Sequence, residues 1–351
     1  MLLDTDNEGN KVFHVAAIFS ELAVFQGIFN WAKENLTTEE ENKLLLDTGK
    51  EGLTVFHAAA ISSTVKLFQV LFNWAKRNLT TEEINKMLLA KVNEGRTVFH
   101  VAAILSKLDI IQIILNWAKE NLIKVEVNKL LLTTDNDERA VFHVAAMFSH
   151  PGVFQGILNW AKNNLTTVEV NKLLLARDKG ERTVIHLAAE FCKLEVIRAV
   201  LNWAKNNLTR EEANKFLLAT DNEERTVLHV AVMFCEVKVS QVVLNWAKEN
   251  LITEEVNKLV LATDNEGRTV FHVAVKMRKL QVFLGILDWA KENLTTVEVN
   301  KLLLARDNEG RTVFNVAAMF NKLQVFHGSF DWVNVNWAEE NLTTQEEDAS
   351  Y

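Results

Sequence analysis

Histidine is the residue of this chain whose type and spacing most readily suggest chemistry, because its side chain serves in both acid–base catalysis and metal binding. Seven histidines stand 43 residues apart: His14, His57, His100, His143, His186, His229 and His272. Such even spacing indicates a chain built of repeated units with one of these histidines in each. The ligands of one ion bind it at about 2 Å, whereas packed helices of neighbouring units lie roughly 8–10 Å apart. Histidines in different units therefore cannot share an ion, so we predict neither a metal site nor a catalytic role for them.

Other signs of catalysis are missing from the sequence. It contains no P-loop and no G-x-S-x-G, H-E-x-x-H or C-x-x-C motif. Its two cysteines, Cys192 and Cys235, are again 43 residues apart and occupy the same place in adjacent units, which is too far for a disulfide. Free thiols are typical of a reducing compartment. We expect a protein that is not an enzyme and needs no cofactor.

Eight tryptophans keep the same step: Trp31, Trp74, Trp117, Trp160, Trp203, Trp246, Trp289 and Trp332. An aromatic row could bind bases or sugars, or it could be buried as a wedge between units. Base stacking normally accompanies a basic groove, and this chain has a formal net charge of -8. The wedge is therefore the favoured interpretation, and nucleic acid is not expected as a partner.

A fixed period of this length indicates a stack of supersecondary units, each of which packs only on its neighbours. We predict one solenoid domain over residues 1–351, with units of approximately 6–48, 49–91, 92–134, 135–177, 178–220, 221–263, 264–306 and 307–351. The last unit has Asn315 in the histidine position and an acidic tail, which predicts a C-terminal cap. No apolar run could cross a bilayer and no signal peptide is recognisable. We expect a cytoplasmic protein without membrane contact.

The unit 264–306 illustrates the elements that each repeat is expected to contain. A polar turn precedes Thr269, which can cap a short first helix through its hydroxyl group. A second helix is predicted over about residues 280–292, and its apolar face is broad enough to be covered on two sides. A third, shorter helix is predicted from Thr295, because Thr295 and Glu298 have the spacing of a capping box.

The segment 54–60, with the sequence TVFHAAA, resembles the T-P-L-H-x-A-A core of the ankyrin repeat, and the polar turn before it resembles the finger turn of that family. The resemblance implies an all-α, ankyrin-like helical repeat solenoid of about eight units, with two helices plus a short third helix in each. The family repeat has about 33 residues and this one has 43, and the extra residues form the third helix. The glycine between the two family helices is replaced by Ser106, Ser149, Cys192 or Arg278.

The resemblance also implies roles for particular residues. The seven histidines would hydrogen-bond the backbone of the neighbouring finger turn and so join the units. The two residues after the Ala-Ala pair of the first helix would face a groove that binds a partner. The candidates at those positions are Ile104, Leu105, Met147, Phe148, Phe191, Met233, Phe234 and Met277. An exposed apolar row would mark an interaction site. The alternative is that the lost glycine re-aims the first helix and buries these side chains in the core.

We therefore expect a non-catalytic, monomeric scaffold that binds another protein along the concave surface of its repeats. The alternative is the repeat region of a larger enzyme, toxin or channel. It is suggested by the first residues, because Leu2 to Asp6 match Val260 to Asp264 in the middle of a repeat.

Overall fold

The computed structural model describes residues 6, 9–19, 22–62, 64–148 and 150–319. Ser149, Trp332 and the part of the predicted C-terminal cap beyond Met319 lie outside these residues. Contacts between Cα atoms divide the chain into two compact units, Met1–Leu187 and Ala188–Tyr351. The boundary falls inside one of the short first helices, and each unit is described by itself.

The described residues form helices and no strand. The first helices of the repeats have 7 or 8 residues: α1 (Val12–Phe19), α4 (Val55–Ile61), α7 (Val98–Ile104), α10 (Val141–Phe148), α13 (Val184–Glu190), α16 (Val227–Phe234), α19 (Val270–Lys276) and α22 (Val313–Met319). The second helices have 14 residues: α2 (Leu22–Asn35), α5 (Val65–Asn78), α8 (Leu108–Asn121), α11 (Pro151–Asn164), α14 (Leu194–Asn207), α17 (Val237–Asn250) and α20 (Leu280–Asn293). The third helices have 8 or 9 residues: α3 (Thr38–Leu46), α6 (Thr81–Leu89), α9 (Lys124–Leu132), α12 (Thr167–Leu175), α15 (Arg210–Leu217), α18 (Thr253–Leu261) and α21 (Thr296–Leu304). A short 3-10 turn, η1 (Lys50–Gly52), precedes α4.

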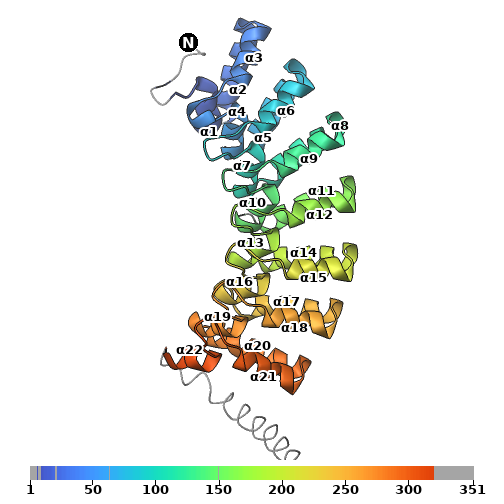
Figure 1. The fold of residues 1–351 in the computed structure, drawn as a ribbon. Helices are drawn as coiled ribbons and strands as arrows, with labels where there is room; N and C mark the ends of the chain where they lie inside the picture. The colour runs from blue at the N-terminus through green and yellow to red at the C-terminus, as the bar shows by residue number, and fades with distance from the viewer. Residues whose placement is uncertain (1–5, 7–8, 20–21, 63, 149, 320–351) are drawn as a thin grey trace, which may run out of the picture. The chain divides into compact units, whose positions relative to one another are not determined.

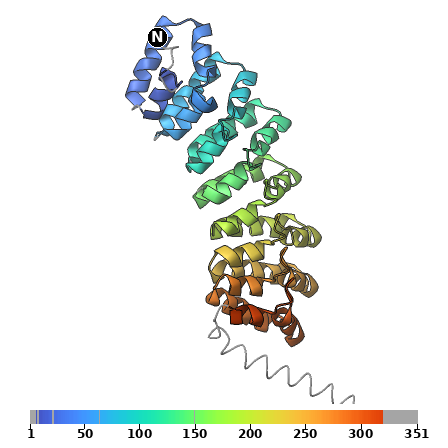
Figure 2. The ribbon, with the colours of Figure 1, turned by 60° about the vertical axis from the view of Figure 1, so that its left-hand side comes forward.

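Within each of the two compact units, helices of the same kind from neighbouring repeats pack on one another. In Met1–Leu187, α4 packs on α1 and α7, and α8 packs on α5 and α11. In Ala188–Tyr351, α19 packs on α16 and α22, and α17 packs on α14 and α20. Figures 1 and 2 show these helices following one another in chain order. Because helices such as α4, α8, α17 and α19 have a neighbour on both sides, their apolar faces are buried, and the predicted all-α repeat fold is confirmed.

Recurring polar contacts mark where second helices end and third helices start. Thr295 Oγ1 accepts the Glu298 N–H (3.3 Å), and the Glu298 carboxylate accepts the Thr295 N–H (2.8 Å). The same capping box stands at Thr37, Thr80, Thr166 and Thr209. At the end of α20, Asn293 Nδ2 donates to the Trp289 carbonyl (2.7 Å). The repeated Asn-Leu-Thr phrase is thus a helix stop followed by a helix start.

In three repeats, the turn between the first and second helices keeps a left-handed residue although its glycine is absent. Ser106, Cys192 and Arg278 have φ angles of 57°, 53° and 60°. A left-handed conformation costs a non-glycine residue about 1–2 kcal/mol, so surrounding packing has to hold it. Cys235, at the same position in repeat 6, has a φ of -98°, so there the loss of the glycine is accompanied by an extended backbone.

Gly267 and Gly310 hold the same position in two finger turns, with φ angles of 72° and 74°. The space around each glycine shows how closely its turn is stacked on the next one. A Cβ at Gly267 would lie 2.8 Å from the backbone nitrogen of Asn308, whereas one at Gly310 would have no described atom within 4 Å. We expect Gly267→Ala to lower the free energy of unfolding by about 2 kcal/mol or more, and Gly310→Ala by about 1 kcal/mol. Urea denaturation followed by circular dichroism measures both. Equal losses would contradict close stacking at Gly267.

Candidate partner-binding surface

The finger turns are the five residues before the capping residue of each first helix. With the repeats numbered 1–8 in chain order, an aspartate–arginine pair holds the finger turns of repeats 4–8. In repeat 7, Asp264 Oδ1 accepts the backbone N–H of Glu266 (3.0 Å) and of Arg268 (2.9 Å). Asp264 Oδ2 pairs with Arg268 Nη2 at 2.7 Å. The same pair occurs as Asp135–Arg139, Asp178–Arg182, Asp221–Arg225 and Asp307–Arg311. Since the aspartate satisfies the turn's own amides, the turn has a fixed conformation without any ligand.

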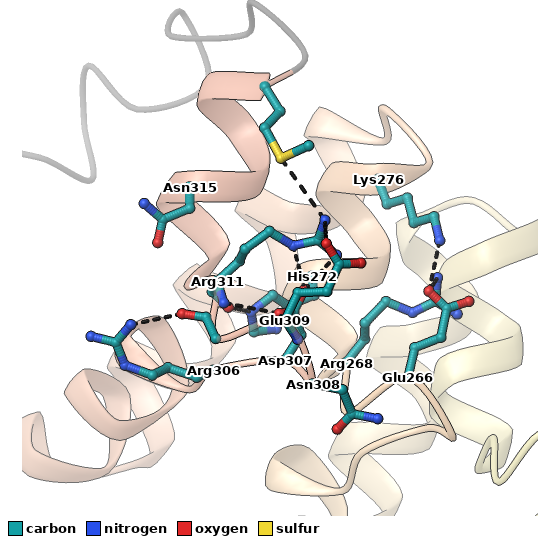
Figure 3. Close-up of polar contacts among 12 residues, drawn as sticks. Glu266, Arg268, His272, Lys276, Arg306, Asp307, Asn308, Glu309, Arg311 and Asn315 are labelled. Carbon is teal, nitrogen blue, oxygen red and sulfur yellow. Dashed lines mark hydrogen bonds and ion pairs between the residues drawn. The ribbon is translucent and has the colours of Figure 1, made fainter.

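Exposed carboxylates follow at the third position of most turns. In repeat 7, the Glu266 carboxylate pairs with Arg268 Nη1 (2.8 Å) and with Lys276 Nζ of α19 (3.0 Å), as Figure 3 shows. The side chains at the equivalent positions, half or more exposed, belong to Glu94, Asp137, Glu223 and Glu309. Each pairs with the arginine of its own turn. Within each compact unit, the finger turns therefore present solvated carboxylates at the same position of successive repeats.

The recurring histidine connects the start of its own first helix to the next finger turn. His100 Nδ1 accepts the Thr97 backbone N–H (3.2 Å) and lies 2.8 Å from Thr97 Oγ1. Because Nδ1 is an acceptor, the ring proton is on Nε2, which donates to the Arg139 carbonyl of the next turn (2.9 Å). The same bond joins His57 to Arg96, His229 to Arg268 and His272 to Arg311. These rings thus use both nitrogens in holding repeats together.

Three of the predicted histidines differ in detail. His143 donates to the carbonyl of Ala176 (2.9 Å), just before the next turn. His186 Nδ1 lies 2.8 Å from the hydroxyl of Thr183. His14 is buried, and neither of its ring nitrogens has a hydrogen bond within the described part of the chain.

Burial makes these histidines neutral. Removal from water lowers the pKa of His57 and of His100 to about 4, against the opposing effect of the bond to the next turn's carbonyl. Burial likewise lowers the pKa of His143, His229 and His272. A ring that is neutral and engaged at both nitrogens is unsuited to acid–base catalysis near pH 7.

The two candidate positions of the first helix differ in exposure. The second position is exposed in every case, at 39–43% of the side chain's accessible area: Leu105, Phe148, Phe191, Phe234 and Met277. At the first position, Ile104 and Met233 are half-buried and Met147 is 6% exposed. Consecutive helical residues point about 100° apart, so in these three pairs the first member lies closer to the core, whereas Lys276 and Met277 are both exposed. The prediction of a contact surface at Met147 is therefore wrong.

Five of the seven described tryptophans are buried, Trp160 is half-buried and Trp31 is exposed. Trp74 is 1% exposed, and its ring lies 4.7 Å from that of Phe29 and 5.7 Å from that of Phe13, measured between centroids. Also buried are Trp117, Trp203, Trp246 and Trp289. Trp31 is 49% exposed, because no described repeat precedes it. The wedge interpretation is therefore wrong for Trp31.

Two cavities lie between finger turns and first helices. The larger, of about 540 Å³, lies in repeats 1–3, and its lining combines the polar side chains of Glu51, Glu94 and Arg96 with an apolar part formed by Leu53, Ile61, Val101, Ile104 and Leu105. The smaller, of about 120 Å³, has Arg268, Lys276 and Arg311 in its walls (Figure 3). Sequence reasoning missed the larger cavity. The signal for it is Gly49 and Leu53, which replace the aspartate and arginine of repeats 4–8.

The described residues provide little for other chemistry. They contain no group of three or more His, Cys, Asp or Glu side chains placed to hold a metal ion. Within the same residues, no helix is both long and apolar enough to cross a membrane. Cys192 and Cys235 are free thiols. Burial raises the pKa of Cys235, whose Sγ lies 2.8 Å from the Ala189 carbonyl, so this sulfur is a protonated donor.

No protein-family model matches the chain, and no curated protein matches it either. Among solved structures, it is similar to the crystal structure of the ankyrin repeat domain of Bcl-3, which is described as a unique member of the IkappaB protein family. The TM-score is 0.53 at 16% sequence identity, and the likeness covers 80% of this chain and 100% of that domain. It confirms the predicted ankyrin-like fold, and at this identity it concerns the fold alone.

The histidine network makes stability depend on pH. The folded pKa of His100 is about 4 and the unfolded value is about 6.5, so its contribution is complete above pH 6.5 and is lost as pH falls towards 4. Repeat 8 has Asn315 in the histidine position, and its Oδ1 accepts the Thr312 N–H (2.9 Å) as a histidine Nδ1 does. Asparagine is therefore a suitable replacement for His100. We expect His100→Asn to keep the cap, to lose the bond to the next turn, and to destabilise by about 1–2 kcal/mol at pH 7.

The same variant should also weaken the pH dependence between pH 7 and 5. One histidine contributes up to about 1.4 kcal/mol per pH unit in this window. Urea denaturation at pH 7, 6 and 5 measures the slope for both proteins. An unchanged slope in His100→Asn would contradict a depressed pKa at His100.

Proposed function

We propose that this protein is a non-catalytic scaffold that binds another protein along its finger turns and first helices. The exposed apolar side chains of this partner surface are Leu105 and Phe148 in Met1–Leu187, and Phe191, Phe234 and Met277 in Ala188–Tyr351. Single exposed apolar residues are common on proteins. The observation that carries the proposal is their recurrence at one structural position in five consecutive repeats.

The construction of the repeats supports this function. The turns beside the partner surface are fixed by their own aspartate–arginine pairs, and the first helices are fixed by the histidine bonds. A surface that is rigid before binding loses little entropy when a partner docks. Modest contacts on several repeats can therefore sum to useful affinity. An ankyrin-type repeat fold is well suited to such binding, because repeat arrays offer extended surfaces.

A catalytic function is disfavoured by the state of the polar groups. The described histidines with a depressed pKa are buried, and most bridge two repeats through both ring nitrogens. The arginines of repeats 4–8 are engaged by the aspartates of their own turns. The histidines and the arginines therefore both serve contacts that hold the repeats and their turns.

We expect Phe148→Ser and Phe234→Ser each to weaken partner capture by about tenfold, because each removes an exposed apolar contact. Their far-ultraviolet circular dichroism should match that of the wild type, since both side chains are more than 40% exposed. The measurement is affinity capture from the native cell with quantitative mass spectrometry, followed by titration of the captured protein.

Val168→Ser is the matched control, because Val168 is 77% exposed but belongs to the third helix α12. It should leave capture unchanged. Loss of capture with Val168→Ser, and none with the phenylalanine variants, would move binding to the third helices and refute the partner surface.

A further inference from the structure

The cavity of about 540 Å³ between the finger turns of repeats 2 and 3 differs from the rest of the partner surface. Its size falls in the range of pockets that hold a small ligand or a large side chain. The walls are mainly apolar, with Arg96 among the polar residues that also line the cavity, and Ile61 and Leu105 within them are 42% and 41% exposed. A buried apolar anchor surrounded by weaker contacts is the usual energetic centre of a protein interface.

The cavity exists because repeat 2 lacks a side chain that other repeats have. In repeat 6, the Arg225 guanidinium reaches from the turn to the first helix, where Nη1 lies 3.6 Å from Met233 Sδ. Leu53 and Ile61 stand at the equivalent positions of repeat 2. Leucine has neither the length nor the charge of arginine, so the space over the first helix stays open and apolar.

Repeats 7 and 8 give the internal comparison. There the equivalent cavity has Arg268 and Arg311 where the larger cavity has Leu53 and Arg96, and it has Lys276 at the position of Ile61. Its volume is about 120 Å³. Replacement of cationic side chains by aliphatic ones therefore accompanies a larger cavity with mainly apolar walls at the same structural position.

The rim of the larger cavity is acidic. Glu51 is exposed and has no ion pair within the described residues, and Glu94 pairs with Arg96 while its side chain stays 63% exposed. The backbone of the two turns is already bonded, since the Asn93 N–H donates to the Glu51 carbonyl (2.8 Å). Recognition at this rim therefore falls to the carboxylates, which attract a cation.

We propose that this cavity is the anchor pocket of the partner surface, and that it takes an aliphatic or aromatic side chain of a partner segment with a lysine or arginine next to it. The inference rests on the proposed function. It adds the chemistry of the partner: the apolar side chain fills the space that an arginine occupies in repeats 4–8, and its basic neighbour pairs with Glu51 and Glu94.

The test selects random 12-residue peptides, displayed on phage, for binding to the full chain. The enriched peptides are then titrated by fluorescence anisotropy. The double variant Gly49→Asp with Leu53→Arg recreates the turn of repeats 4–8 and fills the cavity, and Ile61→Lys copies Lys276 of repeat 7 as an independent second variant. We expect enriched peptides to carry an apolar residue beside Lys or Arg. Each cavity variant should weaken binding by tenfold or more, and Glu51→Gln by about threefold, with circular dichroism unchanged.

The outcomes separate the anchor pocket from the wider proposal. Peptides that lose affinity for Phe148→Ser but bind both cavity variants normally would overturn the pocket and leave the partner surface standing. Peptides insensitive to all of these variants would count against both. Enrichment of peptides without a basic residue, or no enrichment at all, would overturn the assignment of the occupant.

Discussion

The hydrogen bond from a buried, neutral histidine to the carbonyl of the next finger turn is the interaction on which the repeat structure depends. It joins residues 39 positions apart, as between His100 and Arg139. The same ring caps the start of its own helix through Nδ1. Each histidine therefore couples the local geometry of one repeat to the placement of the next, and protonation on Nδ1 would remove the cap. The repeated sequence keeps this ring because one side chain serves both contacts.

Rigid turns also determine where recognition can occur. In repeats 4–8, the arginine next to the first helix is engaged by the aspartate of its own turn, so it covers the helix and is not free for a partner. In repeat 2 that pair is replaced by Gly49 and Leu53, and a mainly apolar cavity appears. On a surface of near-identical units, the departure from the repeat is the feature that can give specificity.

The sequence predicted the periodic features well. The second helix expected over residues 280–292 spans Leu280–Asn293, and the capping box expected at Thr295 is present. Both follow from local rules of apolar spacing and hydrogen bonding. Exposure was harder to predict, because it depends on neighbours. Met147 turns into the core although Phe148 does not, and Trp31 is 49% exposed although Trp74, at the same position of the next repeat, is buried. The cavity was not predicted, because it arises where a leucine replaces an arginine, and no sequence motif marks such a replacement.

The third helix, which lengthens each unit beyond the family repeat, separates stability from recognition. Its paired leucines, such as Leu302 and Leu303 of α21, are buried, and α21 packs on the first helix of the following repeat, α22. The third helix thus strengthens the connection between repeats without contributing to the finger turns. Because the histidine bonds and these leucines hold the repeats together, side chains at the exposed second position of the first helix can vary with little cost to the fold. Leu105, Phe148 and Met277 occupy that position, and their variation fits a surface shaped for contact.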